Sequence, residues 1–315
     1  MPEVSVFDHD AVLAAVSPEE AIDRVRQGFV EYSAGEWVMP PKIYLDASPQ
    51  GDFRAMPARG AGLAILKWAT SFPRNQQVGL PVVMGVICVS SDADGELLAL
   101  IDVRAVTALR TGSIAAIATQ ELAREDARSV GIVGCGLHGT WAGRCLVAAE
   151  YGPGICFDSD PEAAGRLAGE LGWEVGTREE TIGCDVVTCV TPGHEPVITA
   201  ADIGPGAHFN MLGADGPHKA EAEVEAVAAC ALFCDEWRQA NHGGELTGAA
   251  EAGRISREDV TELGDVLTGS AAGRTDPQQT TMFDSTGLAI QDLAVCHAVL
   301  EAGHAGVVRP GRVLI

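Results

Sequence analysis

Two cations stand in stretches of sequence where charge is unexpected. Lys67 interrupts the apolar, strand-like residues 62–69, and Arg110 interrupts a helix-like run of small residues. Burying an ammonium costs several kcal/mol unless an anion meets it. Either an internal carboxylate pairs with Lys67, or the lysine lines a pocket for an anionic substrate. The guanidinium of Arg110 suits bidentate binding of a carboxylate, although a structural ion pair at a helix turn explains it equally well.

Three further residues could join such a site. Lys42 follows two prolines where a strand is expected, and Arg54 precedes Ala55 and Met56; taken singly, each is more typical of a solvated charge. Asp215 lies just beyond an apolar strand. Its carboxylate could act as a general acid/base, or it could cap a helix that starts near Lys219.

A glycine pattern indicates a second kind of site. Gly134, Gly136 and Gly139 follow a short apolar strand and open a helix, and Asp158 ends the next strand. This arrangement predicts a dinucleotide-binding turn, in which the helix N-terminus faces the pyrophosphate. We expect Asp158 to accept hydrogen bonds from the adenine ribose and therefore to favour NAD over NADP. A strand-end or helix-cap role is the alternative for Asp158.

A later strand end, at Thr191 and Pro192, is either a further cofactor contact or an ordinary turn, because strand ends at this edge of a doubly wound sheet face the cofactor cleft. The expected cofactor contacts are Thr111, Gly134, Cys135, Gly136, Leu137, His138, Gly139, Asp158, Thr191, Pro192, Leu212 and Gly213.

The elements that must position these residues fall into two patterns. Up to about residue 123 the sequence predicts an α+β domain, with strands and short turns between a helical region at 9–35 and a helix at 105–123. From residue 129, strands and helices alternate, which predicts a doubly wound parallel sheet of the Rossmann type. We expect a dinucleotide-binding domain at 113–289, and a substrate-binding and dimerisation domain at 1–112 and 290–315. The expected strands are 42–46, 62–70, 82–90, 97–102, 129–133, 155–157, 185–190, 207–212 and 230–234, and the later helices 138–150, 161–171 and 285–302.

Composition narrows the class of partner. The chain has 315 residues and a formal net charge of −23, which argues against nucleic acid or anionic lipid as a partner. No apolar run reaches the length of a membrane span, and no signal peptide is visible. The nine cysteines are scattered singly, which is typical of reduced thiols in a cytoplasmic protein. We expect no metal site.

Taken together, the motifs resemble the ornithine cyclodeaminase/μ-crystallin family, and in particular its archaeal alanine dehydrogenase-like branch. The resemblance spans nearly the whole chain in the expected order. The stretches that carry it are PPKIYLD (40–46), GDFRAMPA (51–58), LKWATSFPRN (66–75), GLPVVMGVI (79–87), LALIDVRAVTALRTGS (98–113), GIVGCG (131–136), GADGPHKAE (213–221), ELGDVLTG (262–269) and MFDSTGLAIQDLA (282–294).

The resemblance implies roles for the residues above. Lys67 and Arg110 would bind the substrate carboxylate with help from Lys42, Met56 would line the pocket, and Asp215 would be the catalytic acid/base. It also implies a homodimer formed through the substrate domain.

Two departures from the family pattern affect these expectations. His218 replaces a glycine in the loop after Asp215. Arg54 stands where ornithine cyclodeaminases carry an acidic residue for the side-chain amine of the substrate. A guanidinium repels such an amine, so we expect an NAD-dependent oxidoreductase acting on a small amino or imino acid. The alternatives are a cyclodeaminase that recycles NAD, and a non-catalytic crystallin-like protein that binds the dinucleotide.

Overall fold

The computed structural model describes residues 3–193, 195–216 and 219–314. The chain divides into two compact units. Unit 1 comprises residues 1–110 and 288–315, and unit 2 comprises residues 111–287. Among the described residues, no helix has both the length and the apolar character that crossing a membrane requires.

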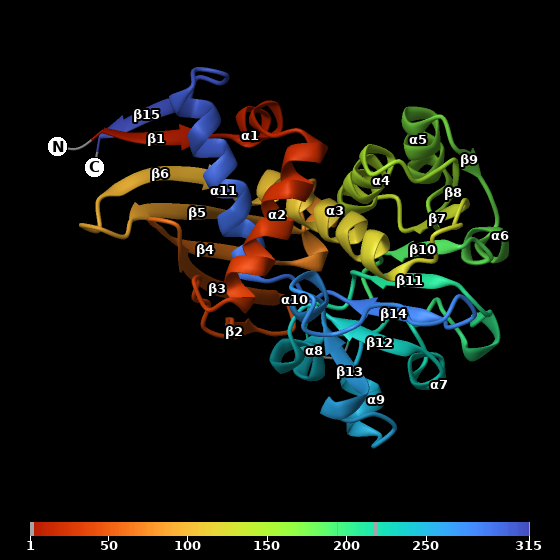
Figure 1. Ribbon diagram of the computed structural model, residues 1–315. Helices are drawn as coiled ribbons and strands as arrows, with labels where there is room; N and C mark the ends of the chain where they lie inside the picture. The colour runs from red at the N-terminus through yellow and green to blue at the C-terminus, as the bar shows by residue number, and fades with distance from the viewer. Residues whose placement is uncertain (1–2, 194, 217–218, 315) are drawn as a thin grey trace. The chain divides into compact units, whose positions relative to one another are not determined.

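Unit 1 is built on a seven-stranded sheet in the order β15-β1-β6-β5-β4-β3-β2 (Figure 1). β1 and β6 are parallel and the other neighbours antiparallel, as expected for an α+β unit. The elements of unit 1 are β1 (Glu3–Phe7), α1 (His9–Ala15), α2 (Pro18–Ser33), β2 (Ile43–Ala47), β3 (Gly51–Gly60), β4 (Leu63–Ser71), a 3-10 helix (Pro73–Val78), β5 (Val83–Ser91), β6 (Leu97–Asp102), the first part of α3 (Val103–Leu122), α11 (Ala289–His304) and β15 (Gly311–Leu314).

Helix α11 covers one face of this sheet. It packs against α2 and against β3 and β4 (Figure 1). Most residues of this helix are buried, the polar Gln291 and Asp292 included, so it has no solvent-facing polar side of the kind an amphipathic helix has. The side chains of β3 and β4 that face it are buried at alternate positions, as the two-residue period of a strand requires.

The helical region at 9–35 is two helices, because Pro18 starts a new one. Val16 is extended, the Ser17 side chain accepts a hydrogen bond from the Glu20 amide, and Pro18 occupies the first turn. Strand β3 was not expected from the sequence. It contains Pro57, which β-strands tolerate only where no ladder bond is needed. β2 pairs with β3 only up to Ala55, so Pro57 lies beyond that ladder.

Unit 2 contains an eight-stranded sheet in the order β13-β12-β14-β11-β10-β7-β8-β9, with every pairing parallel. The predicted Rossmann-type fold is confirmed. Its elements are the rest of α3, β7 (Val130–Val133), α4 (Leu137–Ala148), β8 (Gly154–Phe157), α5 (Pro161–Leu171), β9 (Glu174–Val175), α6 (Arg178–Ile182), β10 (Val186–Cys189), 3-10 helices (Ala200–Asp202, Arg257–Asp259), β11 (His208–Met211), α7 (Val224–Ala228), β12 (Ala231–Cys234), α8 (Trp237–Gly243), α9 (Thr247–Glu251), β13 (Val260–Glu262), α10 (Leu263–Leu267) and β14 (Thr281–Asp284).

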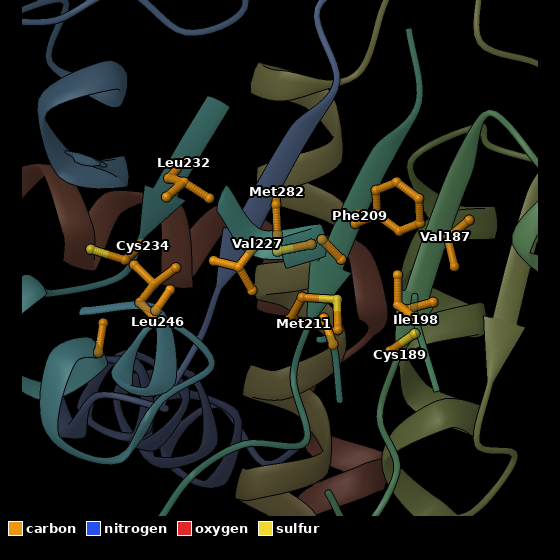
Figure 2. Close-up of a cluster of buried hydrophobic side chains, with 14 of the residues drawn as sticks. Val187, Cys189, Ile198, Phe209, Met211, Val227, Leu232, Cys234, Leu246 and Met282 are labelled. Carbon is orange, nitrogen blue, oxygen red and sulfur yellow. The ribbon is translucent and has the colours of Figure 1, made fainter. Parts of the chain in front are cut away.

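The strand order of unit 2 reverses between β7 and β10, which is where a doubly wound sheet binds its ligand. The core beside these strands is apolar and includes Val187, Phe209 and Met282 (Figure 2). β14 was also missed by the sequence analysis, although it lies between β11 and β12. Its four residues are too few to show a period.

Candidate functional site

The glycine turn of unit 2 is shaped by close backbone approaches. Gly134 has φ +96°, and a Cβ there would lie 2.7 Å from the Val190 carbonyl oxygen. A Cβ on Gly139 would lie 1.9 Å from the Gly134 carbonyl oxygen. Glycine is therefore needed at both positions, because any side chain would separate α4 from β7 or the turn from the end of β10.

Gly136 has a different reason to be glycine. It precedes α4 without a side-chain cap, and a Cβ there would meet no atom of the described chain within 4 Å. The N-terminus of α4 therefore has no side-chain cap from Gly136 and has open space beside that residue, and a helix N-terminus of this kind can bind an anionic phosphate. Leu137 and His138 form the first turn of this helix. The site fits a dinucleotide pyrophosphate.

Asp158 ties the turn to the end of β8. One carboxylate oxygen accepts a hydrogen bond from the Cys135 amide at 2.6 Å, and the other accepts one from the Asp160 amide at 2.8 Å. Asp160, and not Asp158, caps α5. Asp158 is half-buried at the strand end. Its contact with a ribose stays a prediction.

The strand ends after β10 and β11 are joined by a carboxylate that the sequence analysis missed. Glu221 is fully buried and accepts hydrogen bonds from Thr191 and from Gly213. Pro192 is exposed and Leu212 is buried. The sequence did contain evidence for this residue, because Glu221 is the last residue of the stretch 213–221, which carries part of the family resemblance.

Asp215 follows this strand end and pairs with Lys219, whose Nζ donates to Asp215 Oδ1 at 2.7 Å. The alternative that Asp215 caps a helix near Lys219 is wrong, because the next helix, α7, begins only at Val224 with Glu223 as its cap residue. The side chain of Asp215 is 31% exposed, so it is accessible for proton exchange. His218 lies outside the described residues.

In unit 1, Lys67 is buried on β4 and has an internal partner. Its Nζ donates to Asp292 Oδ1 at 2.8 Å and to Thr107 Oγ1 at 2.7 Å. Burial lowers the pKa of Lys67, and the charge of Asp292 opposes that shift. The first alternative from the sequence, an internal carboxylate, is therefore present. It does not exclude a guest, because the ammonium has three donors and these two bonds use two of them.

Arg110 lies beside the same carboxylate but is weakly held. Its Nη1 donates to Gln291 Oε1 at 3.4 Å, and its Nε is 4.0 Å from Asp292 Oδ1. Arg110 Nε, Gln291 Nε2 and Asp292 Oδ2 are buried and have no hydrogen-bond partner among the described residues. Lys67, Arg110 and Asp292 together carry a formal charge of +1. A substrate carboxylate would neutralise this cluster and satisfy its unused donors.

Met56 and Arg54 lie on the same face of the sheet as Lys67. Met56 is directly opposite Lys67 in the β3–β4 pairing, and Arg54 is two residues earlier on β3. Arg54 is buried and engaged by Asp52, with Nε–Oδ1 at 2.6 Å and Nη2–Oδ2 at 3.3 Å. Its charge is thus largely compensated within the chain. Lys42 is half-buried just before β2.

The sequence analysis missed three partners in unit 1: Thr107, Gln291 and Asp292. All three lie in stretches that carry the family resemblance. In unit 2, Thr111 is buried, and its hydroxyl has no partner among the described residues. Across the described ranges, no three His, Cys, Asp or Glu residues are arranged to hold a metal ion.

The sequence matches the model of the ornithine cyclodeaminase/mu-crystallin family over residues 5–306. An alanine dehydrogenase of Archaeoglobus fulgidus is 38% identical over 306 residues, which cover 95% of each chain. The structure superposes on an archaeal alanine dehydrogenase dimer with bound NAD with a TM-score of 0.95 and 36% identity, covering 100% of both chains. It also superposes on the Δ1-pyrroline-2-carboxylate reductase of Thermococcus litoralis, in complex with NADH and L-proline. That TM-score is 0.93 at 25% identity, covering 98% of this chain and 100% of the other.

Proposed function

Because this chain belongs to the ornithine cyclodeaminase/mu-crystallin family, we propose that it is an NAD-dependent oxidoreductase of small amino or imino acids. It acts on the bond between the α-carbon and nitrogen, as an amino acid dehydrogenase or an imino acid reductase. The observation that carries the proposal is the buried cluster of Lys67, Arg110 and Asp292, which has surplus positive charge and unused donors. A small molecule with a carboxylate is the ligand that this chemistry recognises.

Unit 2 binds the dinucleotide in this proposal, and NAD supplies the hydride acceptor or donor when bound. Gly134 permits the tight turn and Gly139 the close packing of α4 on β7, and the open space at Gly136 admits the pyrophosphate to the N-terminus of α4. Asp158 accepts hydrogen bonds from the adenine ribose in this proposal, and its negative charge repels the 2′-phosphate of NADP. Thr111, Cys135, Leu137, His138, Thr191, Pro192, Leu212 and Gly213 complete the proposed contacts.

Unit 1 binds the substrate in this proposal. Lys67 and Arg110 hold the α-carboxylate, and Asp292 and Thr107 orient the Lys67 ammonium. Holding the carboxylate fixes the α-carbon, and positioning of this kind supplies much of an enzyme's rate gain. Met56 borders the substrate beside Lys67, and Lys42 adds a second positive charge. Arg54 engages the Asp52 carboxylate, so this carboxylate is not offered to the side-chain amine of a diamino acid.

Asp215 is the proposed acid/base. It exchanges a proton with the substrate nitrogen and activates the water or ammonia that interconverts the imine and the keto acid. Lys219, 2.7 Å away, keeps a positive charge beside the carboxylate. Replacing Asp215 by Asn should leave NADH binding intact and lower kcat by about a hundredfold. An unchanged kcat would remove Asp215 from the mechanism.

We also propose a homodimer formed through the open face of the unit 1 sheet. Ile43 and Leu45 on β2 and Leu66 and Trp68 on β4 are between 38% and 63% exposed. The strand pairing places them together, on the face opposite Lys67. A contiguous apolar patch of this kind is typical of a subunit interface. Leu66→Glu combined with Trp68→Glu should give a monomer in sedimentation, and a dimer that persists would place the interface elsewhere.

A cytoplasmic location is part of the proposal, because all nine cysteines are free thiols, which persist in a reducing compartment.

A panel of substrates tests the function. Keto acids with ammonia or methylamine, cyclic imines, and ornithine are each incubated with the enzyme and followed by NADH absorbance and product mass. NADH consumption with a keto acid and ammonia, or with a cyclic imine, supports the proposal. Proline formed from ornithine without net NADH change would identify a cyclodeaminase. Tight NADH binding without turnover of any substrate would identify a carrier protein.

A further inference from the structure

We propose that Glu221 is a positioning residue whose carboxylate ties two functional loops of unit 2 into one rigid frame. The loops are those at Thr191, after β10, and at Gly213, after β11. The inference rests on the proposed function, because it concerns loops assigned there to the cofactor and to the acid/base Asp215.

The tie is direct and uses both carboxylate oxygens. Oε1 accepts hydrogen bonds from the Thr191 amide at 2.6 Å and from the Thr191 hydroxyl at 2.8 Å. Oε2 accepts one from the Gly213 amide at 2.6 Å. β10 and β11 are adjacent parallel strands, so the carboxylate bridges two neighbouring strand ends at the ligand-binding edge of the sheet.

Gly213 allows this close approach. A Cβ at residue 213 would lie 2.2 Å from the Thr191 carbonyl oxygen and 2.7 Å from Glu221 Oε1. A side chain there would therefore separate the two loops from each other and from the carboxylate. This explains the glycine without reference to a positive φ, which Gly213 does not have.

The backbone of Glu221 is itself held by hydrogen bonds. Its carbonyl oxygen accepts hydrogen bonds from the amides of Val197 and Ile198 at 2.6 and 2.9 Å. Its own amide donates to Glu245 Oε2 at 2.8 Å, and the Ala222 amide donates to Glu245 Oε1 at 2.7 Å. The carboxylate of Glu221 is thus a fixed point to which the two loops conform.

The hydrogen-bond partners of the Glu221 carboxyl group indicate its protonation state. Both oxygens of Glu221 receive donors only, so a proton on either oxygen would oppose an N–H or O–H group. Burial, followed by the charge of Glu221, raises the pKa of Glu245 to about 8. Burial also raises the pKa of Glu221, and the hydrogen bonds from Thr191 and Gly213 oppose that shift, so these bonds favour the carboxylate form of Glu221.

Asp215 lies only two residues beyond Gly213, so releasing Gly213 changes the position of the acid/base. The test is Glu221→Gln, which keeps the shape of the side chain. A single amide oxygen can hold either Thr191 or Gly213, and the amide NH2 group meets a donor at the other loop. Turnover is sensitive to such displacement, so kcat at saturating NADH should fall by about tenfold or more.

Glu245→Gln is the matched control. It also replaces a buried acid bonded to backbone amides, but it touches neither loop. Glu245 acts on the loops only through the backbone of Glu221 and Ala222, so the kcat and NADH affinity of Glu245→Gln should change less than those of Glu221→Gln, although Tm falls in both variants. Should Glu221→Gln fail to fold, Thr191→Val removes one of the three bonds to Glu221 and should lower kcat about threefold.

The proposal is contradicted if Glu221→Gln keeps the wild-type kcat and NADH affinity while its Tm falls as in Glu245→Gln. Glu221 would then be a purely structural residue. Wild-type kcat in Thr191→Val would contradict the proposal too. Failure of the proposed function looks different, because the wild-type protein itself would then neither bind NADH nor turn over any substrate.

Discussion

The two units stabilise buried charge in different ways. In unit 1 a buried anion meets side-chain cations, as Asp292 does with Lys67 and Arg110. In unit 2, the buried carboxylate of Glu221 is held mainly by backbone amides. A side-chain cation leaves a charge surplus that attracts one kind of guest. Backbone amides carry only partial charges, and they hold an anion wherever the chain leaves them room.

The largest loss of activity is expected in unit 1, where the positive charge of the cluster is carried by individual side chains. Lys67→Met should lower kcat/KM for the amino or keto acid by about a thousandfold, because it removes the buried cation that we propose as a partner of the substrate carboxylate. It also leaves Asp292 buried beside a weakly held Arg110, which should destabilise the fold by about 3 kcal/mol. Steady-state kinetics and chemical denaturation measure the two effects.

A second variant separates binding from folding at this cluster. Lys67→Met combined with Asp292→Asn removes both charges of the pair, so stability should recover while kcat/KM stays low. Recovery of activity together with stability would show that Lys67 serves only as the partner of Asp292.

A smaller loss of affinity is expected in unit 2, where backbone amides are proposed to bind the pyrophosphate of NAD. Gly136→Ala places a methyl group in space that no other described atom occupies, so the fold is kept and the pyrophosphate is obstructed. The dissociation constant of NADH should rise about tenfold, or about 1.4 kcal/mol. Fluorescence titration with NADH measures it, and an unchanged affinity would place the cofactor elsewhere.

The buried acids of unit 2 should also make stability depend on pH. Glu245 has a pKa raised from 4.5 to about 8 by burial and by the charge of Glu221. The folded state therefore holds a proton that the unfolded state releases, so this contribution is fully present below about pH 4.5 and is lost as pH rises to about 8. Tm should fall across that range, and the slope should be smaller in Glu245→Gln. Equal slopes in both proteins would show that Glu245 is ionised in the folded state.

The smallest effect comes from a glycine without a binding role, and it serves as the control for Gly136. Gly165 is exposed within α5, and a Cβ there would meet nothing within 4 Å. Gly165→Ala should stabilise the fold by about 0.5–1 kcal/mol through helix propensity and leave NADH binding unchanged. A weakened affinity in this variant would mean that the Gly136 result reflects a general change in unit 2.

The sequence by itself determined the nucleotide-binding architecture. The glycine turn, the strand before it and Asp158 are specified by backbone sterics and strand periodicity over about thirty residues, so local reasoning reaches them. The same local reasoning found the helical region at 9–35. It failed for β3 and β14, where Pro57 or the shortness of the strand hid the pattern.

Only the tertiary structure decided which charges are compensated. Lys67 and Asp292 are 225 residues apart in sequence, and Glu221 joins loops 30 and 8 residues away. Electrostatic energy depends on separation in space and on burial, neither of which sequence spacing records. The sequence could therefore nominate Lys67, but the fold alone showed that Asp292 pairs with it and that Asp52 engages Arg54.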